Sequence, residues 1–233
     1  MVLRIGHRGA AGTHPENTLV SFRRAVELGA HGIEFDVHRT KDGHIVVIHD
    51  HHLERTTNGT GWIMHRTLDE IRQCDAGSWK GPEFSGERVP TLLEVIRQTP
   101  ASLMLFLELK AGSLHYPGIE DDLVKLIREE GVLSRVQISS FDHHGLAKLH
   151  ALEPKLELGM LFAENPLDPV GMAHACGANA LHPSWQWTSP HMVEMAHGSG
   201  MKVNVWTVDD PQVIAIMKQF GVDGIISDYP DRV

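Results

Sequence analysis

Two carboxylates lie two residues apart in a strand-like part of the sequence. The stretch IEFDV carries Glu34 and Asp36, and residues i and i+2 of a strand project from the same face. A KDG turn signal (41–43) follows, and the chain returns through an apolar run that ends in His49 and Asp50. We therefore expect a hairpin that brings His49 back beside the two acids, with Asp50 as the partner that orients its imidazole.

Charged residues also follow two other apolar runs. LRIG (3–6) leads into His7 and Arg8, and the run that ends in LELK places Glu108 and Lys110 on one face. In a parallel barrel, the carboxyl ends of the strands open onto a shared mouth, where active sites lie. Each residue taken alone fits a surface charge at a strand end, but together they predict that three acids and several bases converge on one mouth.

Three carboxylates at one mouth repel one another, and a buried charge without a partner is costly. A divalent cation relieves this conflict, and a ligand set made only of oxygens favours Mg²⁺ or Ca²⁺ over zinc. Glu34, Asp36 and Glu108 are therefore candidate ligands of one divalent cation. The alternative is a salt-bridge network in which Arg8 and Lys110 neutralise the acids.

A metal with few protein ligands keeps coordination positions open for an anionic substrate. Arg8 and Lys110 are placed to hold the remaining charge of that substrate. His7 and His49 suit acid–base work, in which one neutral imidazole takes a proton and one protonated imidazole gives one. These groups together predict hydrolysis of a phosphate ester, although His7 by itself also fits a buried core histidine.

The elements that must position these residues follow a regular alternation of apolar runs and helical stretches. One helix is expected to open at Pro15, and Ser189 and Asp210 are N-caps followed by Pro. Eight βα units predict an α/β protein with a TIM-type (β/α)₈ barrel rather than an open sheet. The expected strands are 3–6, 31–37, 101–109, 135–140, 156–161, 178–182, 202–208 and 223–228.

The segment 51–100 interrupts this alternation between the second and third strands. It is rich in turn residues and holds two capping-box patterns, Thr67-x-x-Glu70 and Thr91-x-x-Glu94. It is too long for an ordinary βα loop and has too few apolar residues for a core of its own. We therefore expect a single domain over 1–233, with 51–100 as an insertion over the mouth of the barrel.

Composition narrows the choice of partners. The formal net charge is −9 with the acids scattered, so nucleic acid and anionic membrane surfaces are not expected as partners. Cys74 and Cys176 lack metal-type spacing and suggest free thiols in a reducing compartment. With no signal-like or membrane-spanning segment, the sequence predicts a cytoplasmic protein. The 17 histidines are too scattered to favour metal storage.

Several motifs in fixed order resemble those of the glycerophosphodiester phosphodiesterases. The resemblance extends over essentially the whole chain, including the insertion. It implies a TIM-type barrel that hydrolyses glycerophosphodiesters, such as glycerophosphocholine or glycerophosphoethanolamine, to sn-glycerol 3-phosphate and an alcohol. The motifs are GHRGA…HPENT (6–18), EFDV…DG…VV.HD..L.RTT.G.G (34–61), LELK (107–110), SSFD (139–142) and VWTV (205–208).

The resemblance also implies roles for individual residues. His7 and His49 would form the general acid/base pair, with the acid and base roles not assigned between them. Family members use Mg²⁺, Ca²⁺ or other divalent ions. The remaining implied roles are those of metal ligands for Glu34, Asp36 and Glu108, and of phosphate-binding residues for Arg8 and Lys110.

Other residues are weaker candidates. Phe141, His182 and Trp206 fall at later strand ends, where they either line the glycerol pocket or simply pack. Glu16 and Asn17 are expected to support the loop after His7 through capping hydrogen bonds.

Two rival functions follow from the same residues. One is a lysophospholipase D-like or phospholipase C-like activity on lysolipids, which requires an apolar surface for approach to the lipid. The other is a barrel that binds a metal or a sugar phosphate without catalysis, which would have no need of the two histidines.

Overall fold

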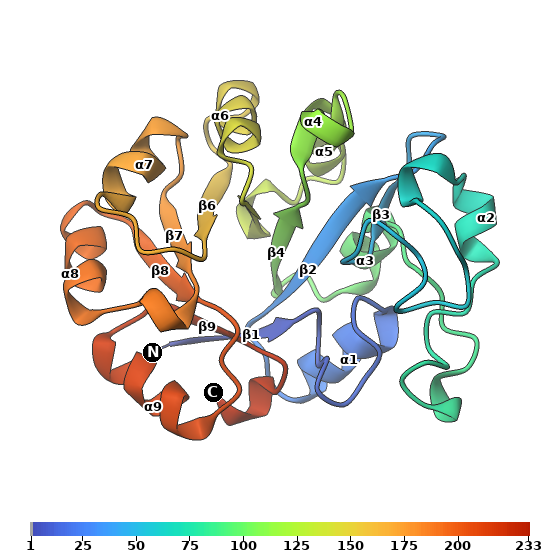
Figure 1. Ribbon diagram of the computed structural model, residues 1–233, viewed down its shortest axis with the longest axis horizontal. Coiled ribbons are helices and arrows are strands. Elements are labelled where there is room, and N and C mark those ends of the chain that lie inside the picture. Colours follow the sequence, from blue (N-terminus) through green and yellow to red (C-terminus); the bar gives the residue numbers. More distant parts are fainter. Residues whose placement is uncertain (1) are drawn as a thin grey trace.

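The computed structural model describes residues 2–233, and within that range eight parallel strands close into a barrel with a ninth, antiparallel strand outside it (Figure 1). Each barrel strand pairs with its neighbours, and β1 pairs with both β2 and β9. The predicted TIM barrel is confirmed. In the order of pairing, its strands are β1 (Leu3–His7), β2 (Gly32–Arg39), β4 (Met104–Leu109), β5 (Val136–Ser140), β6 (Glu157–Phe162), β7 (Ala180–Pro183), β8 (Lys202–Val205) and β9 (Gly224–Ser227).

Helices form an outer ring around the strands (Figure 1). Ser189 and Asp210 cap α8 and α9 as expected, each with Pro next. Short 3₁₀ helices lie at Ile63–His65, Pro82–Phe84, Leu133–Arg135, Trp185–Trp187 and Pro230–Arg232. The α-helices are α1 (Leu19–Glu27), α2 (Leu68–Arg72), α3 (Leu92–Gln98), α4 (Gly112–His115), α5 (Ile119–Glu129), α6 (His143–Leu152), α7 (Pro169–Ala175), α8 (Pro190–Gly198) and α9 (Pro211–Phe220).

The first helix begins later than predicted. Its N-cap is Thr18, whose side chain accepts a hydrogen bond from the Ser21 amide, rather than the residue before Pro15. Asn17 has a φ of +59°, a left-handed conformation that an α-helix cannot include. The residues from Pro15 to Asn17 therefore stay outside the helix, in the loop that follows β1.

The predicted hairpin is present. β3 (Ile45–Val47) runs antiparallel to β2, with Val37 opposite Val47 and Arg39 opposite Ile45. The segment that follows carries α2 and α3, and both capping boxes predicted for it are formed. It extends the molecule on the side of β2 and β3 (Figure 1). Its small apolar cluster includes two residues of the hairpin, Val46 and Ile48. The other members are Leu53, Ile63, Ile71, Ala76 and Val89.

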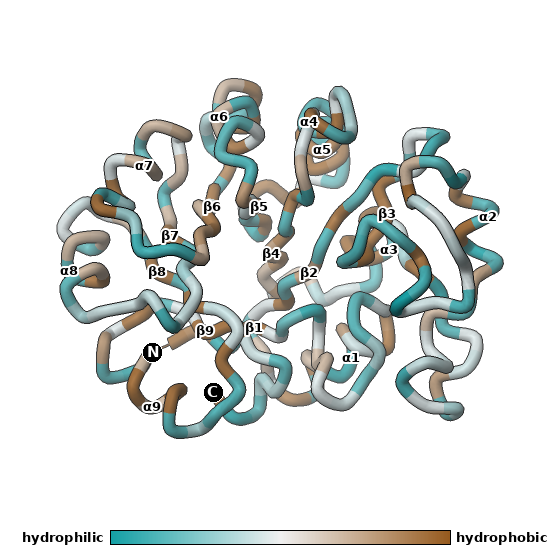
Figure 2. Tube along the Cα trace, viewed as in Figure 1, coloured by the Kyte–Doolittle hydropathy of each residue, from teal (hydrophilic) through white to brown (hydrophobic). Residues whose placement is uncertain are grey.

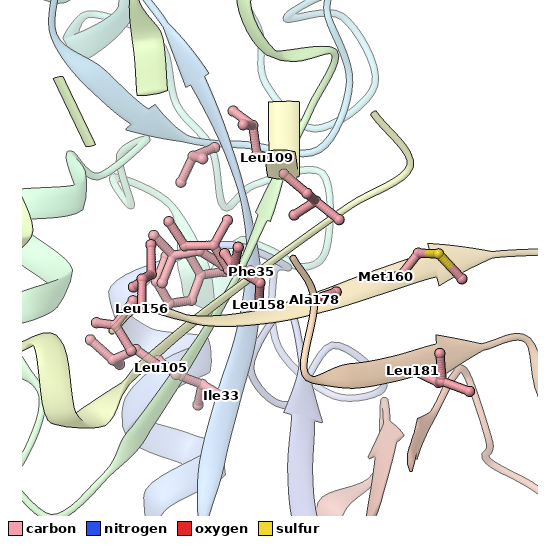
Figure 3. Close-up of a cluster of buried hydrophobic side chains, with 14 of the residues drawn as sticks. Ile33, Phe35, Leu105, Leu109, Leu156, Leu158, Met160, Ala178 and Leu181 are labelled. Carbon is pink, nitrogen blue, oxygen red and sulfur yellow. The ribbon is translucent and has the colours of Figure 1, made fainter. Parts of the chain in front are cut away.

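The main core fills the space between the outer face of the barrel and the helices. Figure 3 shows Ile33 and Phe35 of β2 beside Leu105 of the neighbouring strand β4, and Leu158 of β6 belongs to the same cluster. The strands are apolar, whereas the hydrophilic residues lie mainly on the surrounding helices and loops (Figure 2). Inside the barrel a separate apolar group contains Ile5, Phe106 and Ile226, which leaves the ends of the strands free for polar side chains.

Candidate active site

The carboxyl ends of β1, β2 and β4 bring the predicted site residues together. β1 and β4 flank β2 in the sheet, and the register places His7 opposite Glu34 and Asp36 opposite Glu108. Strand alternation then directs Glu34 and Asp36 to the same side. Three segments that lie far apart in the sequence therefore meet at one end of the barrel.

Glu34, Asp36 and Glu108 form a compact acidic group. One carboxylate oxygen from each lies within 4.8 Å of the other two, and Glu34 and Asp36 are buried. Burial, together with the neighbouring Asp36 charge, raises the pKa of Glu34 to about 8. Burial acts on Asp36 in the same direction, but Lys110 and Arg8 outweigh it and hold the pKa of Asp36 far below its usual range.

Two cations accompany the acids. Lys110 Nζ lies 3.0 Å from Asp36 Oδ1 and also contacts Glu108. Arg8 lies near Asp36, with Nε 3.5 Å from Oδ2, and its backbone amide donates to Glu34 Oε2 at 3.2 Å. The ion pairs expected of a salt-bridge network are therefore present.

These ion pairs do not neutralise all three acids. The terminal Nη1 of Arg8 is committed to Glu16 at 2.7 Å, and within residues 2–233 the buried Arg8 Nε has no hydrogen-bond partner. Glu34 has no Lys or Arg side chain within ion-pair distance among these residues, which is why burial can raise its pKa so far. Three clustered carboxylates of this kind fit a hard divalent cation bound through oxygen.

The loop after β1 supports the acids directly. Asn17 Nδ2 donates to Asp36 Oδ2 at 2.8 Å, and the Asp36 amide donates to Asn17 Oδ1 at 3.4 Å. The predicted capping roles of Glu16 and Asn17 are wrong. The positive φ of Asn17 keeps both residues in the loop before the helix, and Thr18 supplies the N-cap. Their side chains bind site residues instead.

The two histidines have matching partners. His7 Nδ1 lies 2.6 Å from Asp228 Oδ1, and His49 Nδ1 lies 2.7 Å from Asp50 Oδ1. A carboxylate only accepts hydrogen bonds, so each Nδ1 donates. Within residues 2–233 neither Nε2 has a hydrogen-bond partner, and that of His7 lies 3.9 Å from Glu34 Oε2. The contact between His49 and Asp50 was expected from the sequence, whereas Asp228 was missed.

A signal for Asp228 exists in the sequence. The last strand run, GIIS, is followed at once by this residue, so Asp228 stands at the carboxyl end of β9. Closure of the barrel pairs β9 with β1, which carries His7. An acid directly after the last strand of a predicted barrel is therefore a candidate partner for a base at the end of the first strand.

The environments of the two imidazoles differ. Burial lowers the pKa of His7, but the hydrogen bond to Asp228 and the charge of Glu34 outweigh it, so the pKa is raised. For His49, burial and the cations Lys110 and Arg8 outweigh Asp36 and Asp50, so its pKa is lowered.

A cavity of about 120 Å³ opens at the mouth of the barrel between these groups. Phe141 and Trp206 both line it and pack edge to face, with ring centroids 5.7 Å apart, and Trp206 Nε1 donates to the His182 carbonyl at 2.7 Å. Burial lowers the pKa of His182 to about 3, so its imidazole is neutral. The sequence-predicted residues that line the cavity are His7, Arg8, Glu34, His49, Glu108, Lys110, Phe141, His182 and Trp206.

This arrangement can bind an anion and move protons. The two cations and two of the three acids, Glu34 and Glu108, line the cavity together with the two carboxylate-supported imidazoles. Aromatic side chains line the same cavity. Such a set can hold a phosphoryl group, take a proton from a nucleophile and give a proton to a leaving group.

No helix among residues 2–233 combines the length and the apolar character needed to cross a membrane.

Comparisons with known protein sequences identify one family. Residues 7–232 match the glycerophosphoryl diester phosphodiesterase family. A glycerophosphodiester phosphodiesterase of Caldanaerobacter subterraneus subsp. tengcongensis is 45% identical over 232 residues, which are 99% of this chain and 96% of that protein.

Solved structures give the same result. A phosphodiesterase of Oleispira antarctica, in complex with the product sn-glycerol-3-phosphate, is similar with a TM-score of 0.88 and 33% identity over 98% of this chain and 93% of that one. A putative glycerophosphoryl diester phosphodiesterase from Silicibacter pomeroyi DSS-3 reaches a TM-score of 0.89 at 30% identity, over 99% of this chain and 91% of that one.

Proposed function

Because the chain belongs to the glycerophosphoryl diester phosphodiesterase family, we propose that it hydrolyses glycerophosphodiesters to sn-glycerol 3-phosphate and an alcohol, with His7 and His49 as the acid–base pair. It is an enzyme of the phosphoric diester hydrolase class. Glycerophosphocholine and glycerophosphoethanolamine are the proposed substrates. The observation that carries the proposal is the pair of carboxylate-supported imidazoles that line one cavity beside a cluster of three acids, of which Glu34 and Glu108 line the cavity as well.

Glu34, Asp36 and Glu108 are proposed to hold one divalent cation, Mg²⁺ or Ca²⁺. When bound, such an ion neutralises charge on the phosphoryl oxygens and polarises the phosphorus centre. The support is the donor set itself, in which three oxygens from different carboxylates lie within 4.8 Å of one another. Arg8 and Lys110 line the same cavity and would bind the remaining phosphoryl oxygens through charge-assisted hydrogen bonds.

The two imidazoles divide the proton transfers. A nucleophilic oxygen, from water or from the 2-hydroxyl of the glycerol group, forms a bond to phosphorus as the bond to the leaving alcohol oxygen breaks. Water gives sn-glycerol 3-phosphate directly, whereas the 2-hydroxyl gives a cyclic phosphate that a water molecule opens in a second step, with cleavage of the bond between phosphorus and the 2-oxygen. One histidine takes the proton of the nucleophile at Nε2, and the other gives a proton from Nε2 to the leaving oxygen. Asp50 and Asp228 hold Nδ1 of each ring in the tautomer that this exchange requires.

Phe141, His182 and Trp206 are proposed to line the site for the glycerol group. They line the same cavity as the two histidines, and the neutral His182 offers a hydrogen-bonding ring rather than a charge. Apolar ring surface on one side and a neutral polar atom on the other suit an uncharged polyol.

The segment 51–100 is proposed to act with the barrel as one functional unit. Lys80 Nζ donates to the Ala11 carbonyl, in the loop after β1, at 2.7 Å. This contact supports a position beside the mouth, where the segment would border the alcohol group of the substrate.

Release of sn-glycerol 3-phosphate from glycerophosphocholine and glycerophosphoethanolamine tests this function. Activity should disappear after EDTA treatment and return with Mg²⁺ or Ca²⁺. His49→Ala should lower kcat by roughly 10²- to 10⁴-fold, because a proton-transfer group is lost. His52→Ala, at a neighbouring and more exposed histidine, should retain wild-type activity.

Two outcomes would contradict the proposal. If the folded protein releases no glycerol phosphate with Mg²⁺ or with Ca²⁺, this reaction is excluded. If His49→Ala retains the wild-type rate, His49 takes no part in the mechanism.

A further inference from the structure

One arginine outside the barrel connects two parts of the site. Arg55 lies just after the hairpin and binds two carboxylates at once. Its Nε and Nη2 donate to Asp50 Oδ2 and Oδ1 at 2.7 and 2.9 Å. Its Nη1 and Nη2 donate to Glu16 Oε2 and Oε1 at 2.8 and 2.7 Å. Both contacts are bidentate, so the guanidinium plane fixes the position of each carboxylate.

Each carboxylate in turn holds a residue of the site. Asp50 Oδ1 is 2.7 Å from Nδ1 of His49, and Glu16 Oε1 accepts from Arg8 Nη1 at 2.7 Å. The hydrogen bonds therefore run without interruption from His49 through Asp50, Arg55 and Glu16 to Arg8. This chain joins the hairpin that carries one imidazole to the loop that carries a phosphate-binding cation.

Exposure alone would make Arg55 an ordinary surface residue. Its side chain is 44% exposed, like those of Arg66 and Arg72 in the same segment at 40% and 45%. Exposed single ion pairs of that kind contribute little to stability. Arg55 differs because its partner Glu16 is only 11% exposed and because both partners are themselves bonded to residues that line the cavity.

We propose that Arg55 is a positioning residue that aligns the His49 imidazole with the Arg8 guanidinium through Asp50 and Glu16. The inference rests on the proposed function, in which His49 transfers a proton and Arg8 binds the phosphoryl group. It assigns a task to the first part of the segment 51–100. Through Arg55, this segment fixes the distance between the proton-transfer group and the anion-binding group.

The charge of Arg55 has a separate consequence for His49. The charged and titratable groups that face this imidazole are Asp50, Asp36, Lys110, Arg8 and His51. Arg55 neutralises Asp50, the acid bonded to the ring. Without that cation, the negative charge of Asp50 acts on His49 unopposed and raises the pKa of the imidazole.

Two substitutions separate geometry from charge. Arg55→Gln removes both the charge and the two bidentate contacts. Arg55→Lys keeps the charge but cannot bind both carboxylates in bidentate fashion. Arg72→Gln and Arg72→Lys are the matched controls, because Arg72 is equally exposed and, within residues 2–233, pairs only with Glu94. The measurements are kcat, KM and the pH profile of kcat/KM for release of sn-glycerol 3-phosphate, with the melting temperature of each variant.

Both Arg55 variants should lower kcat/KM by roughly 10- to 100-fold, as loss of an orienting partner usually does. In Arg55→Gln the limb of the pH profile that reports His49 should also move to higher pH, whereas in Arg55→Lys it should stay in place. A purely structural role would lower the melting temperature of Arg55→Gln and leave that limb unmoved. The Arg72 variants should match the wild type.

The outcomes also separate this inference from the proposed function. If His49→Ala is inactive but both Arg55 variants keep wild-type kcat/KM and pH profiles, the positioning role is excluded and the reaction stands. If His49→Ala retains activity, the proposed function itself fails. If Arg55→Gln does not fold, Arg55→Lys decides, because wild-type kcat/KM in that variant overturns the inference.

Discussion

At the scale of single residues, the site contains the same pair twice, a histidine whose Nδ1 is hydrogen-bonded to an aspartate. His7 and His49 each pair Nδ1 with an aspartate oxygen, at 2.6 Å for Asp228 and 2.7 Å for Asp50. Asp50 is the next residue in the chain after His49, so a reader of the sequence finds it at once. Asp228 is separated from His7 by 221 positions and comes near it only because the barrel closes.

Both aspartates are expected to be required for catalysis to a similar degree. Asp228→Asn and Asp50→Asn should each lower kcat by at least about tenfold and by up to roughly 10⁴-fold, because an amide does not hold the imidazole in the required tautomer. Steady-state kinetics with glycerophosphocholine measures this. Asp231→Asn, at an exposed residue of the same C-terminal segment, should have no effect, and a wild-type kcat in Asp228→Asn would show that His7 needs no carboxylate.

At the scale of elements, a glycine in β6 allows side chains of the strands on either side of it, β5 and β7, to contact each other. His182 of β7 reaches Gln137 of β5, with 2.9 Å between Nε2 and Oε1, although β6 lies between these strands. Gly159 of β6 makes this possible, because a Cβ at that position would lie 2.6 Å from His182 Nε2. A small residue in β6 therefore decides where a ring of the proposed glycerol site stands.

Gly159→Ala is expected to destabilise the protein and to disturb the cavity. The new methyl group must displace the His182 ring or the strand, at a cost of roughly 1–3 kcal/mol. Urea unfolding measures the change in the free energy of unfolding. As a control, Gly198→Ala at the end of α8, where a Cβ would have no described atom within 4 Å, should be neutral or stabilise by up to about 1 kcal/mol. Equal stability of the two variants would exclude the steric role of Gly159.

At the scale of the whole molecule, the barrel keeps a titratable ring in its interior. Burial lowers the pKa of His182 to about 3, whereas an imidazole in an unfolded chain has a pKa of about 6.5. Between these values the unfolded state binds more protons than the folded state. The contribution of this ring to stability is therefore complete above pH 6.5 and is lost as the pH falls toward 3.

As the pH is lowered from 7 to 5, protonation of His182 in the unfolded chain should lower the free energy of unfolding by roughly 2 kcal/mol. This part is measured as the difference between the wild type and His182→Gln, because the raised pKa values of Glu34 and His7 act in the opposite direction. His182→Gln should remove this part of the pH dependence, which urea unfolding at several pH values in EDTA measures. His191→Gln, which removes an exposed imidazole, should keep the wild-type slope. Parallel pH curves for the wild type and His182→Gln would show that the buried ring is not responsible.

Local information in the sequence determined the elements and much of the site. Alternating apolar runs and helix caps were enough to predict eight barrel strands, because each depends on residues that are neighbours in the chain. The spacing of Glu34 and Asp36, the turn before His49 and the shared face of Glu108 and Lys110 are local in the same way. The predicted start of α1 was wrong, because the side chain of Asn17 binds Asp36 of β2, a residue far from it in the chain.

Only the tertiary structure decided which further residues join the predicted groups. Closure of the barrel places Asp228 against His7, and Arg55 bonds Asp50 and Glu16 together across the edge of the mouth. It also decides the charge balance, because burial raises the pKa of Glu34 while Lys110 and Arg8 hold that of Asp36 down. Burial, and the short distances between segments far apart in the chain, exist only when the strands are paired, and no pattern of neighbouring residues encodes them.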